Sequence, residues 1–314
     1  MASALLYRRA IPAGARISIW HAPDGWALRR FDWPAEGASR GSILFQGGRG
    51  DISEKYLEAF AHWHDQGWSI TSFDWRGQGG SGRLSPDPFV GHVENFDIFI
   101  SDFAAFWADW SPSARGPLVV MGHSMGGHLV LRALTEGVAT PDAAVLIAPM
   151  LGLHSPLGAR LGERFARVLG GFGNSARAAW KTNERPATLE SRQSLLTHDR
   201  SRYEDELWWR DAEPQLRFGP PSWRWLIEAF ASTRKLRADP RLKTMKVPAL
   251  VVVAMADKLV HAKLALQAVG KLPDVRVLRF GKESAHEVLR EADPVRNRAL
   301  GEIDIFLASR ARQK

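Results

Sequence analysis

The chain has 314 residues, 45% of them hydrophobic, and a formal net charge of +8. This apolar content is too high for a disordered chain and is sufficient for a large buried core. Because the sequence contains no cysteine, disulfide bonds, zinc–thiolate sites, thiol catalysis and thiol redox sensing are excluded.

The N-terminal stretch does not resemble a secretory signal, because its apolar run is short and arginines follow it early. No run in the sequence approaches the ~20 apolar residues that a membrane-spanning helix needs. We therefore expect a soluble, cytoplasmic protein that holds no metal ion and no other cofactor.

Short β-type runs alternate with helix-length amphipathic segments along most of the chain. Residues 17–22 and 26–33 predict an opening hairpin with its turn at Pro23-Asp24-Gly25. Further strands are predicted at 42–46, 68–75, 117–123, 143–149, 248–257 and 275–280. Helices are predicted at 52–67, 95–110, 124–137, 261–272 and 294–310. Since continuous Val, Ile and Leu runs are typical of strands buried on both faces, we expect an α/β fold with an eight-stranded, mostly parallel sheet covered by helices on both faces.

Residues 152–246 interrupt this alternation. The segment reads as helical, is rich in Arg and Trp, and is punctuated by Gly and Pro. An insertion after the sixth strand lies at the carboxyl ends of the strands, where ligands bind in open α/β sheets. The sequence therefore predicts a helical lid over 152–246, between two parts of one core at 1–151 and 247–314.

Most of the excess positive charge belongs to the predicted lid. Between Leu151 and Lys246 the sequence has 18 Lys and Arg residues against 11 Asp and Glu residues, an excess of seven. One interpretation is a solvated basic face, and the other is attraction to an anionic surface. No nucleic-acid motif accompanies the charge, so we expect no nucleic-acid partner. Peripheral contact with an anionic membrane surface, such as the inner membrane, and an ordinary solvated face stay open as the two alternatives.

A serine between glycines occupies the turn from the fifth strand to the next helix. The run Gly122-His123-Ser124-Met125-Gly126 has the pattern G-x-S-x-G in the strand–turn–helix setting that gives this pattern its meaning. The glycines let neighbouring backbone pass close by, and the helix directs its N-terminal amides at the hydroxyl. We predict Ser124 as a nucleophile and the Met125 N–H as an oxyanion donor; the alternative is a chance glycine-rich turn.

A serine nucleophile needs a base, and the base needs an acid to orient it. In this architecture the order is Ser, then Asp or Glu, then His. Asp257 follows a late strand and His286 follows the last one, so we predict them as acid and base. The alternatives are a helix N-cap for Asp257 and a solvated loop position for His286. His261 lies too near Asp257 in sequence to serve as base, and His123 and His128 are expected to pack.

The second oxyanion donor is expected from the loop after the third strand, "FQGGRGD" (45–51). Gly48 is the first choice because its N–H approaches a substrate without a Cβ in the way, and Gly47 is the alternative. The glycine-dense turn 74–82 is interpreted as structural. It is no phosphate loop, because no helix-opening Lys-Ser or Lys-Thr follows it.

Four motifs carry a resemblance to a known family: "GHSMGG" (122–127), "DWRGQGGSGR" (74–83), "AMADKLV" (254–260) and "SAHEVLRE" (284–291). They resemble the α/β-hydrolase family and, within it, the lysophospholipase and monoacylglycerol-lipase group of serine hydrolases. The similarity covers about residues 42–290. The resemblance implies a triad and an oxyanion hole formed by Ser124, Asp257 and His286 with the backbone N–H groups of Gly48 and Met125.

One position in the oxyanion strand differs from the motif of the monoacylglycerol lipases. Those enzymes carry His-Gly at the oxyanion strand, whereas this chain has Gln46-Gly47, which favours the lysophospholipase branch. Gln46 and Gly47 are predicted to contact substrate. In the predicted lid, aromatic side chains that combine apolar area with a polar N–H are expected to receive one acyl chain near a basic rim: Trp208, Trp209, Trp223 and Trp225. Packing of the lid onto the core is the alternative for each of them.

The predicted function is therefore hydrolysis of carboxylic esters by a serine hydrolase with an acyl-enzyme mechanism, acting on single-chain lipid esters such as lysophospholipids. Monoacylglycerol lipase or general esterase activity is the alternative. Acyl transfer, amide cleavage and peptide cleavage on the same triad are less favoured, and a non-catalytic binding protein is least favoured. Ser124 excludes the dehalogenase and epoxide-hydrolase variants, which need a carboxylate at this turn.

Overall fold

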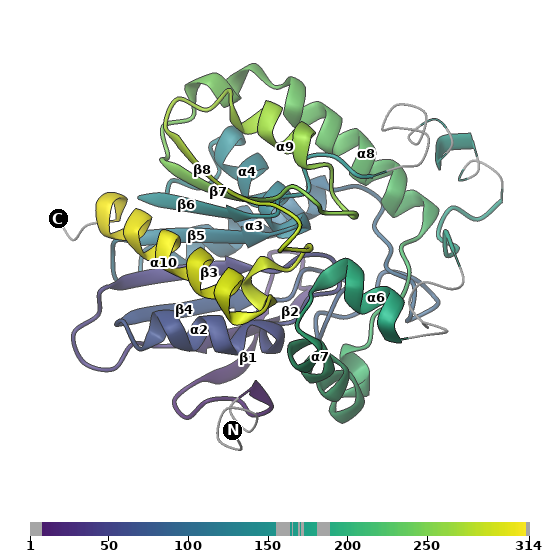
Figure 1. Ribbon diagram of the computed structural model, residues 1–314. Helices are drawn as coiled ribbons and strands as arrows, with labels where there is room; N and C mark the ends of the chain where they lie inside the picture. Colours follow the sequence, from purple (N-terminus) through teal and green to yellow (C-terminus); the bar gives the residue numbers. More distant parts are fainter. Residues whose placement is uncertain are drawn as a thin grey trace.

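The computed structural model describes residues 8–154, 164, 166–168, 170, 173–180 and 189–311. Within these residues, an eight-stranded sheet with the order β1-β2-β4-β3-β5-β6-β7-β8 forms the centre of the molecule (Figure 1). β1 (Arg16–His21) and β2 (Ala27–Trp33) form the predicted hairpin, and β2 also pairs antiparallel with β4. The other neighbouring pairs of this sheet are parallel, which confirms the predicted α/β-hydrolase type of sheet.

The remaining strands follow the predicted positions closely: β3 (Gly41–Gln46), β4 (Trp68–Phe73), β5 (Leu118–His123), β6 (Ala143–Ile147), β7 (Ala249–Ala254) and β8 (Val275–Phe280). β7 ends three residues before the predicted end, which leaves Asp257 in the turn beyond the strand. β4 likewise ends at Phe73, so the glycine-dense turn begins immediately after it.

Helices cover both faces of the sheet: α2 (Leu57–His64) and α10 (Asp293–Arg310) on one, and α3 (Asp97–Trp110), α4 (Met125–Glu136) and α9 (Ala262–Val269) on the other. The alternation along each strand assigns its side chains to the two layers. In β5, Val119 and Met121 pack into the layer with α2, and Val120 packs into the layer with α3. Burial on both faces, at roughly 1.5–3 kcal/mol for each large apolar side chain, is what selected the continuous Val, Ile and Leu runs.

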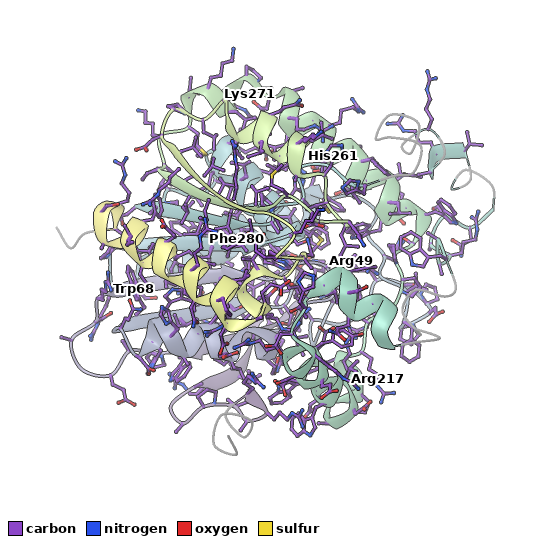
Figure 2. All side chains as sticks on the ribbon, viewed as in Figure 1. Arg49, Trp68, Arg217, His261, Lys271 and Phe280 are labelled. Carbon is purple, nitrogen blue, oxygen red and sulfur yellow. The ribbon has the colours of Figure 1, made fainter. Side chains whose placement is uncertain are left out.

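The chain between β6 and β7 contributes α6 (Leu189–Leu196), α7 (Arg200–Ala212) and α8 (Trp223–Ala238), which we call the cap helices. α7 and α8 begin at side-chain N-caps, Asp199 and Ser222, whose oxygens accept from Arg202 N and Trp225 N. Figure 2 shows Trp68, at the start of β4, and Arg217, after α7, at opposite ends of the molecule. α7 thus lies at the end of the sheet toward which the parallel strands run (Figure 1).

Part of the predicted lid lies outside the described residues, namely 155–163, 165, 169, 171–172 and 181–188. The division into a lid at 152–246 and core parts at 1–151 and 247–314 stays a prediction. Across the part of the chain that the structure describes, no helix is both long enough and apolar enough to cross a bilayer.

Candidate active site

Ser124 lies in a strained turn between β5 and α4. Its φ is 53° and its ψ is −117°, a region that non-glycine residues rarely adopt and that clusters at functional sites. The flanking glycines make this turn sterically possible. A Cβ on Gly126 would lie 2.3 Å from the Gln46 carbonyl oxygen, and a Cβ on Gly122 would lie 2.7 Å from the backbone of Gly126. The G-x-S-x-G run is therefore required by close backbone packing, which argues against a chance glycine-rich turn.

The three residues predicted as nucleophile, base and acid meet at the carboxyl end of the sheet. The distance from His286 Nε2 to Ser124 Oγ is 2.8 Å, and the distance from His286 Nδ1 to Asp257 Oδ2 is 2.5 Å. The other oxygen of Asp257 accepts from the backbone N–H groups of Leu259, at 2.7 Å, and Val260, at 3.0 Å. One continuous line of hydrogen bonds thus joins the hydroxyl, the imidazole and a carboxylate fixed by its own turn.

The structure also bears on the alternatives for these residues. α9 is capped by the side chain of His261 rather than by Asp257, so the helix N-cap interpretation of Asp257 is wrong. His286 is buried, so it is not a solvated loop histidine. His261 instead stacks on His154 with ring centroids 5.0 Å apart.

Neighbouring charges shift the pKa values of Asp257 and His286 in opposite directions. Burial opposes the charged form of Asp257, but the charge and hydrogen bond of His286 and two backbone amides outweigh it and lower the pKa of the carboxyl. Burial also opposes the imidazolium form of His286, yet the charge of Asp257 overcomes this effect and raises the pKa of His286. Asp257 is therefore ionised at neutral pH, and the imidazole is a stronger base than a free histidine.

The two histidines near the serine turn are buried, as expected for packing residues. His128 Nε2 lies 2.8 Å from Ser232 Oγ, and burial followed by the charge of Arg132 lowers the pKa of His128 to about 3. His123 Nδ1 lies 2.9 Å from Asp51 Oδ2. His128 is therefore a neutral core residue, whereas His123 belongs to a polar network around Asp51.

The loop after β3 lies directly against Ser124. A Cβ on Gly48 would lie 2.9 Å from the Cβ of Ser124. The Gly48 N–H, however, donates to Asp51 Oδ2 at 2.7 Å, so this amide is engaged by a carboxylate in the structure. Met125 is the first residue of α4, where backbone N–H groups have no partner within the helix. Figure 2 shows Arg49 of the same loop at the end of the sheet toward α6 and α7.

Of the two predicted substrate contacts, Gln46 lies deeper than expected, whereas Gly47 is half-buried. Gln46 is 0% exposed, and its side-chain amide atoms have no hydrogen-bond partner within the described residues, so a substrate cannot reach it in this structure. The Gly47 carbonyl accepts from Trp75 Nε1 at 2.9 Å. This contact ties the oxyanion strand to the turn after β4.

The four predicted lid tryptophans lie on two different helices. On α7, Trp209 is buried and donates to the Arg8 carbonyl at 2.9 Å, while Trp208 is 38% exposed. On α8, Trp223 is half-buried, and Trp225 is buried with its ring 5.6 Å from that of Phe96. Trp209 and Trp225 therefore serve packing in this structure, as the alternative interpretation had it. Trp208 is the most exposed of the four, although its ring also packs edge-on against Trp209 with centroids 4.9 Å apart.

Sequence reasoning missed the polar residues that follow the oxyanion loop. Asp51, Lys55 and Tyr56 are all buried, and Asp51 receives hydrogen bonds from Lys55 Nζ, at 2.6 Å, and Tyr56 OH, at 2.6 Å. The Asp51/Lys55 spacing of four was the available signal, but on its own it indicates an ordinary surface pair. In the described residues, no group of three or more His, Cys, Asp or Glu side chains is placed to hold a metal ion.

Comparisons with known proteins concern the family of the chain. A family model described as serine aminopeptidase, S33 matches residues 37–293. Lysophospholipase L2 of Escherichia coli K12 is 28% identical over 241 residues, which are 72% of this chain and 68% of the relative. Probable lysophospholipase L2 of Haemophilus influenzae is 26% identical over 284 residues, 87% of this chain and 85% of the relative.

Solved structures share the fold. A soluble variant of monoglyceride lipase from Saccharomyces cerevisiae, in complex with a substrate analog, has a TM-score of 0.76 and 17% identity, with 96% of this chain and 97% of that chain covered. The monoacylglycerol lipase of Paleococcus ferrophilus has a TM-score of 0.70 and 18% identity, with 90% and 99% covered. Family match, fold and strained serine turn lead to one conclusion: the chain belongs to the serine aminopeptidase S33 family and is a serine hydrolase of the α/β-hydrolase fold.

Proposed function

We propose that this serine ester hydrolase acts on single-chain lipid esters such as lysophospholipids, with Ser124 as its nucleophile. The observation that carries the proposal is the unbroken hydrogen-bonded line from Ser124 Oγ through His286 to Asp257, at 2.8 and 2.5 Å. The names of the curated relatives, lysophospholipase L2 and probable lysophospholipase L2, support the substrate class.

The proposed mechanism proceeds through an acyl-enzyme. His286 Nε2 removes the proton of Ser124 Oγ as the oxygen attacks the ester carbonyl. Asp257 stabilises the imidazolium that results. The imidazolium then gives the proton to the departing alcohol oxygen, and the acyl group remains on Ser124. Water, deprotonated by His286, attacks the acyl-enzyme; the fatty acid leaves and Oγ recovers its proton.

The oxyanion donors that we propose are the N–H groups of Met125 and Gly48. The N-terminus of α4 supplies the first, together with the positive end of the helix dipole. The second becomes available when the developing oxyanion replaces the Asp51 carboxylate as the acceptor of the Gly48 N–H. Gly47 is the alternative donor in the same loop.

We further propose that the cap region contacts anionic membrane surfaces. Two large apolar side chains are exposed there: Trp208 on α7, at 38%, and Phe89, at 50%, in the loop before α3 whose backbone lies against Gly219 of the cap. Exposed arginines occur in the same parts of the chain, among them Arg200 and Arg217. Aromatic side chains suit a water–lipid boundary, and arginines bind phosphates. This combination supports capture of substrate from a lipid surface.

A substrate panel tests the proposed function. The purified full chain is assayed on lysophosphatidylcholine, lysophosphatidylethanolamine, monoacylglycerol, a p-nitrophenyl ester and an aminoacyl amide, and is labelled with a fluorophosphonate probe. We expect labelling of Ser124 and the highest kcat/KM on a lysophospholipid. Preference for monoacylglycerol would move the protein to the lipase alternative. Labelling with turnover of the amide alone would replace the ester substrate class.

A further inference from the structure

A cluster of buried charged side chains lies beneath the oxyanion loop and is centred on Lys55. The side chain of Lys55 is 3% exposed. Its Nζ lies 2.6 Å from Asp51 Oδ1, 2.7 Å from Glu287 Oε1 and 3.1 Å from Glu206 Oε2. Arg290 Nη1 lies 2.9 Å from Glu206 Oε2 and also pairs with Glu287. We call these five residues the Lys55 cluster.

The members of the Lys55 cluster come from three separate segments. Asp51 and Lys55 belong to the oxyanion loop and to the 3-10 turn η1 (Ser53–Tyr56) that follows it. Glu287 and Arg290 follow His286 directly, and Arg290 lies in η4 (Val288–Arg290). Glu206 comes from the cap helix α7. The cluster therefore connects the loop of the oxyanion donor, the loop of the base and the cap.

All five members are charged. Burial opposes ionisation of Lys55, but its three carboxylate neighbours outweigh it and raise the pKa of the ammonium group. Burial likewise opposes the charged forms of the acids, yet the pKa values of Asp51, Glu206 and Glu287 are lowered by their cations. Such buried pairs contribute little net stability, whereas removal of one partner leaves an uncompensated charge. The cluster therefore fixes geometry more than it stabilises the fold.

Two routes lead from the cluster to the reacting groups. Asp51 Oδ2 accepts from the Gly48 N–H at 2.7 Å and from Tyr56 OH at 2.6 Å, and it lies 2.9 Å from His123 Nδ1. The opposite nitrogen of His123 lies 3.4 Å from the carbonyl oxygen of His286. The second route is covalent, because Glu287 is the next residue after His286.

We propose that the Lys55 cluster positions the oxyanion loop and His286 relative to Ser124, and that Glu206 makes this arrangement dependent on the cap helix α7. The inference rests on the proposed catalytic function of Ser124 and His286. The members of the Lys55 cluster are positioning residues, since they act on the reaction through Gly48 and His286.

The cluster also sets part of the electrostatic field at His286. The charged and titratable groups that face this imidazole are Asp257 from the turn after β7, Glu287 beside it in the chain, Asp51 from the oxyanion loop and His123 of β5, whose ring centroid is 4.9 Å away. Loss of a negative charge from the cluster makes the potential at His286 more positive and lowers its pKa. Loss of a positive charge has the opposite effect.

Four variants of the full chain separate positioning from general destabilisation. Glu206→Gln removes one negative charge with little change of shape, and Lys55→Met removes one positive charge. Lys55→Arg keeps the charge. Glu204→Gln is the matched control, because Glu204 lies on the same helix, its side chain is 48% exposed, and within the described residues it forms an ion pair only with Arg200. Circular dichroism and thermal melts establish which variants fold.

The first readout is the pKa of His286, followed by NMR titration of its ring signals in each folded variant. We expect Glu206→Gln to lower this pKa and Lys55→Met to raise it, while Lys55→Arg and Glu204→Gln leave it near the wild-type value. The opposite signs follow from the charges alone and would not arise from loosened packing. If Lys55→Met does not fold, the isosteric Glu206→Gln variant still decides the direction.

The second readout is turnover of a small soluble ester, which needs no contact between the cap and lipid. Because misplacement of a reacting group by about 1 Å can cost ~100-fold in rate, we expect kcat to fall by up to ~100-fold in Glu206→Gln and Lys55→Met, with KM little changed. Lys55→Arg should recover part of the loss.

Folded Glu206→Gln with wild-type kcat and an unshifted His286 pKa would overturn the inference. Failure of the proposed function would look different: the wild-type protein itself would show no ester turnover and no fluorophosphonate labelling of Ser124. The NMR titration would still report in that case whether the cluster acts on His286.

Discussion

The two sides of Ser124 are held in place by different physical means. On the base side, His286 is held by a single carboxylate, Asp257, whose second oxygen is fixed by two amides of its own turn. On the oxyanion side, Gly48 is held by Asp51, whose position depends on Lys55 and through it on the cap residue Glu206. The carboxylate of the base side, Asp257, is fixed by its own turn, whereas the carboxylate of the oxyanion side, Asp51, depends on contacts far apart in the sequence. Mutations on the two sides should therefore fail in different ways.

The largest effect on turnover is expected from substitution of Ser124, which lies between the two sides. Ser124→Ala should lower turnover by roughly 10³-fold or more while the protein stays folded, because the proposed nucleophile is lost and no packing group is removed. Turnover of a p-nitrophenyl ester and fluorophosphonate labelling measure this loss. Ser101→Ala, at an exposed position of α3, is the matched control. A Ser124→Ala variant with near-wild-type turnover would remove this serine from the mechanism.

The base side is tested by Asp257→Asn, for which we expect a smaller loss than for Ser124→Ala or His286→Ala. Asparagine keeps the shape but removes the charge that stabilises the imidazolium. In the wild type, His286 must be neutral to accept a proton, so kcat/KM should fall as the pH drops through the raised pKa of His286, above its ordinary 6.5. In Asp257→Asn this acid limb should move to lower pH. An acid limb at the same pH in both proteins would assign it to another group.

The oxyanion side is tested by Gly48→Val. The new Cβ would lie 2.9 Å from both Ser124 Cβ and Asp51 Oδ2, so the loop must shift and its donor is lost. Such a donor is worth roughly 3 kcal/mol of transition-state stabilisation, about 100-fold in kcat. Gly301→Val is the control, since a Cβ on Gly301 meets nothing within 4 Å. Unchanged kinetics in folded Gly48→Val would place the oxyanion hole elsewhere.

The difference between the base side and the oxyanion side also determines how much of the site could be predicted from the sequence. Continuous apolar runs in the sequence indicate buried strands. Residues that follow the carboxyl ends of parallel strands meet at one edge of the sheet. Ser124, Asp257 and His286 could therefore be predicted from the sequence alone. The sequence also indicated Gly48, but it gave no such signal for the residues that hold the Gly48 loop in place. Lys55 is separated from Glu206 by half of the chain, and nothing in either local sequence indicates that both are buried. The predicted helix at 52–67 likewise begins as the 3-10 turn η1, whose polar side chains are fixed by these distant partners.

The aromatic residues of the cap show a related limit. In the sequence, a tryptophan beside arginines is equally typical of a side chain at a water–lipid boundary and of one that packs against the core. The same large ring suits both environments. The structure separates the members of this set: Trp209 and Trp225 are buried, and Trp208 is 38% exposed. Only the arrangement of α7 and α8 against the core decides between the two roles.

The smallest effect on activity is expected from changes at the surface of the cap helices. If the basic cap aids capture from anionic lipid, activity on lysophospholipid in anionic vesicles should fall as salt rises, because exposed charges are screened over a Debye length of ~8 Å at physiological ionic strength. Activity on a small soluble ester should barely change, since the Lys55 cluster and the triad are buried and poorly screened. Trp208→Ala should weaken vesicle binding in sedimentation assays without changing turnover of the soluble ester. Equal salt sensitivity on both substrates, or none on either, would leave the basic cap as ordinary solvated surface.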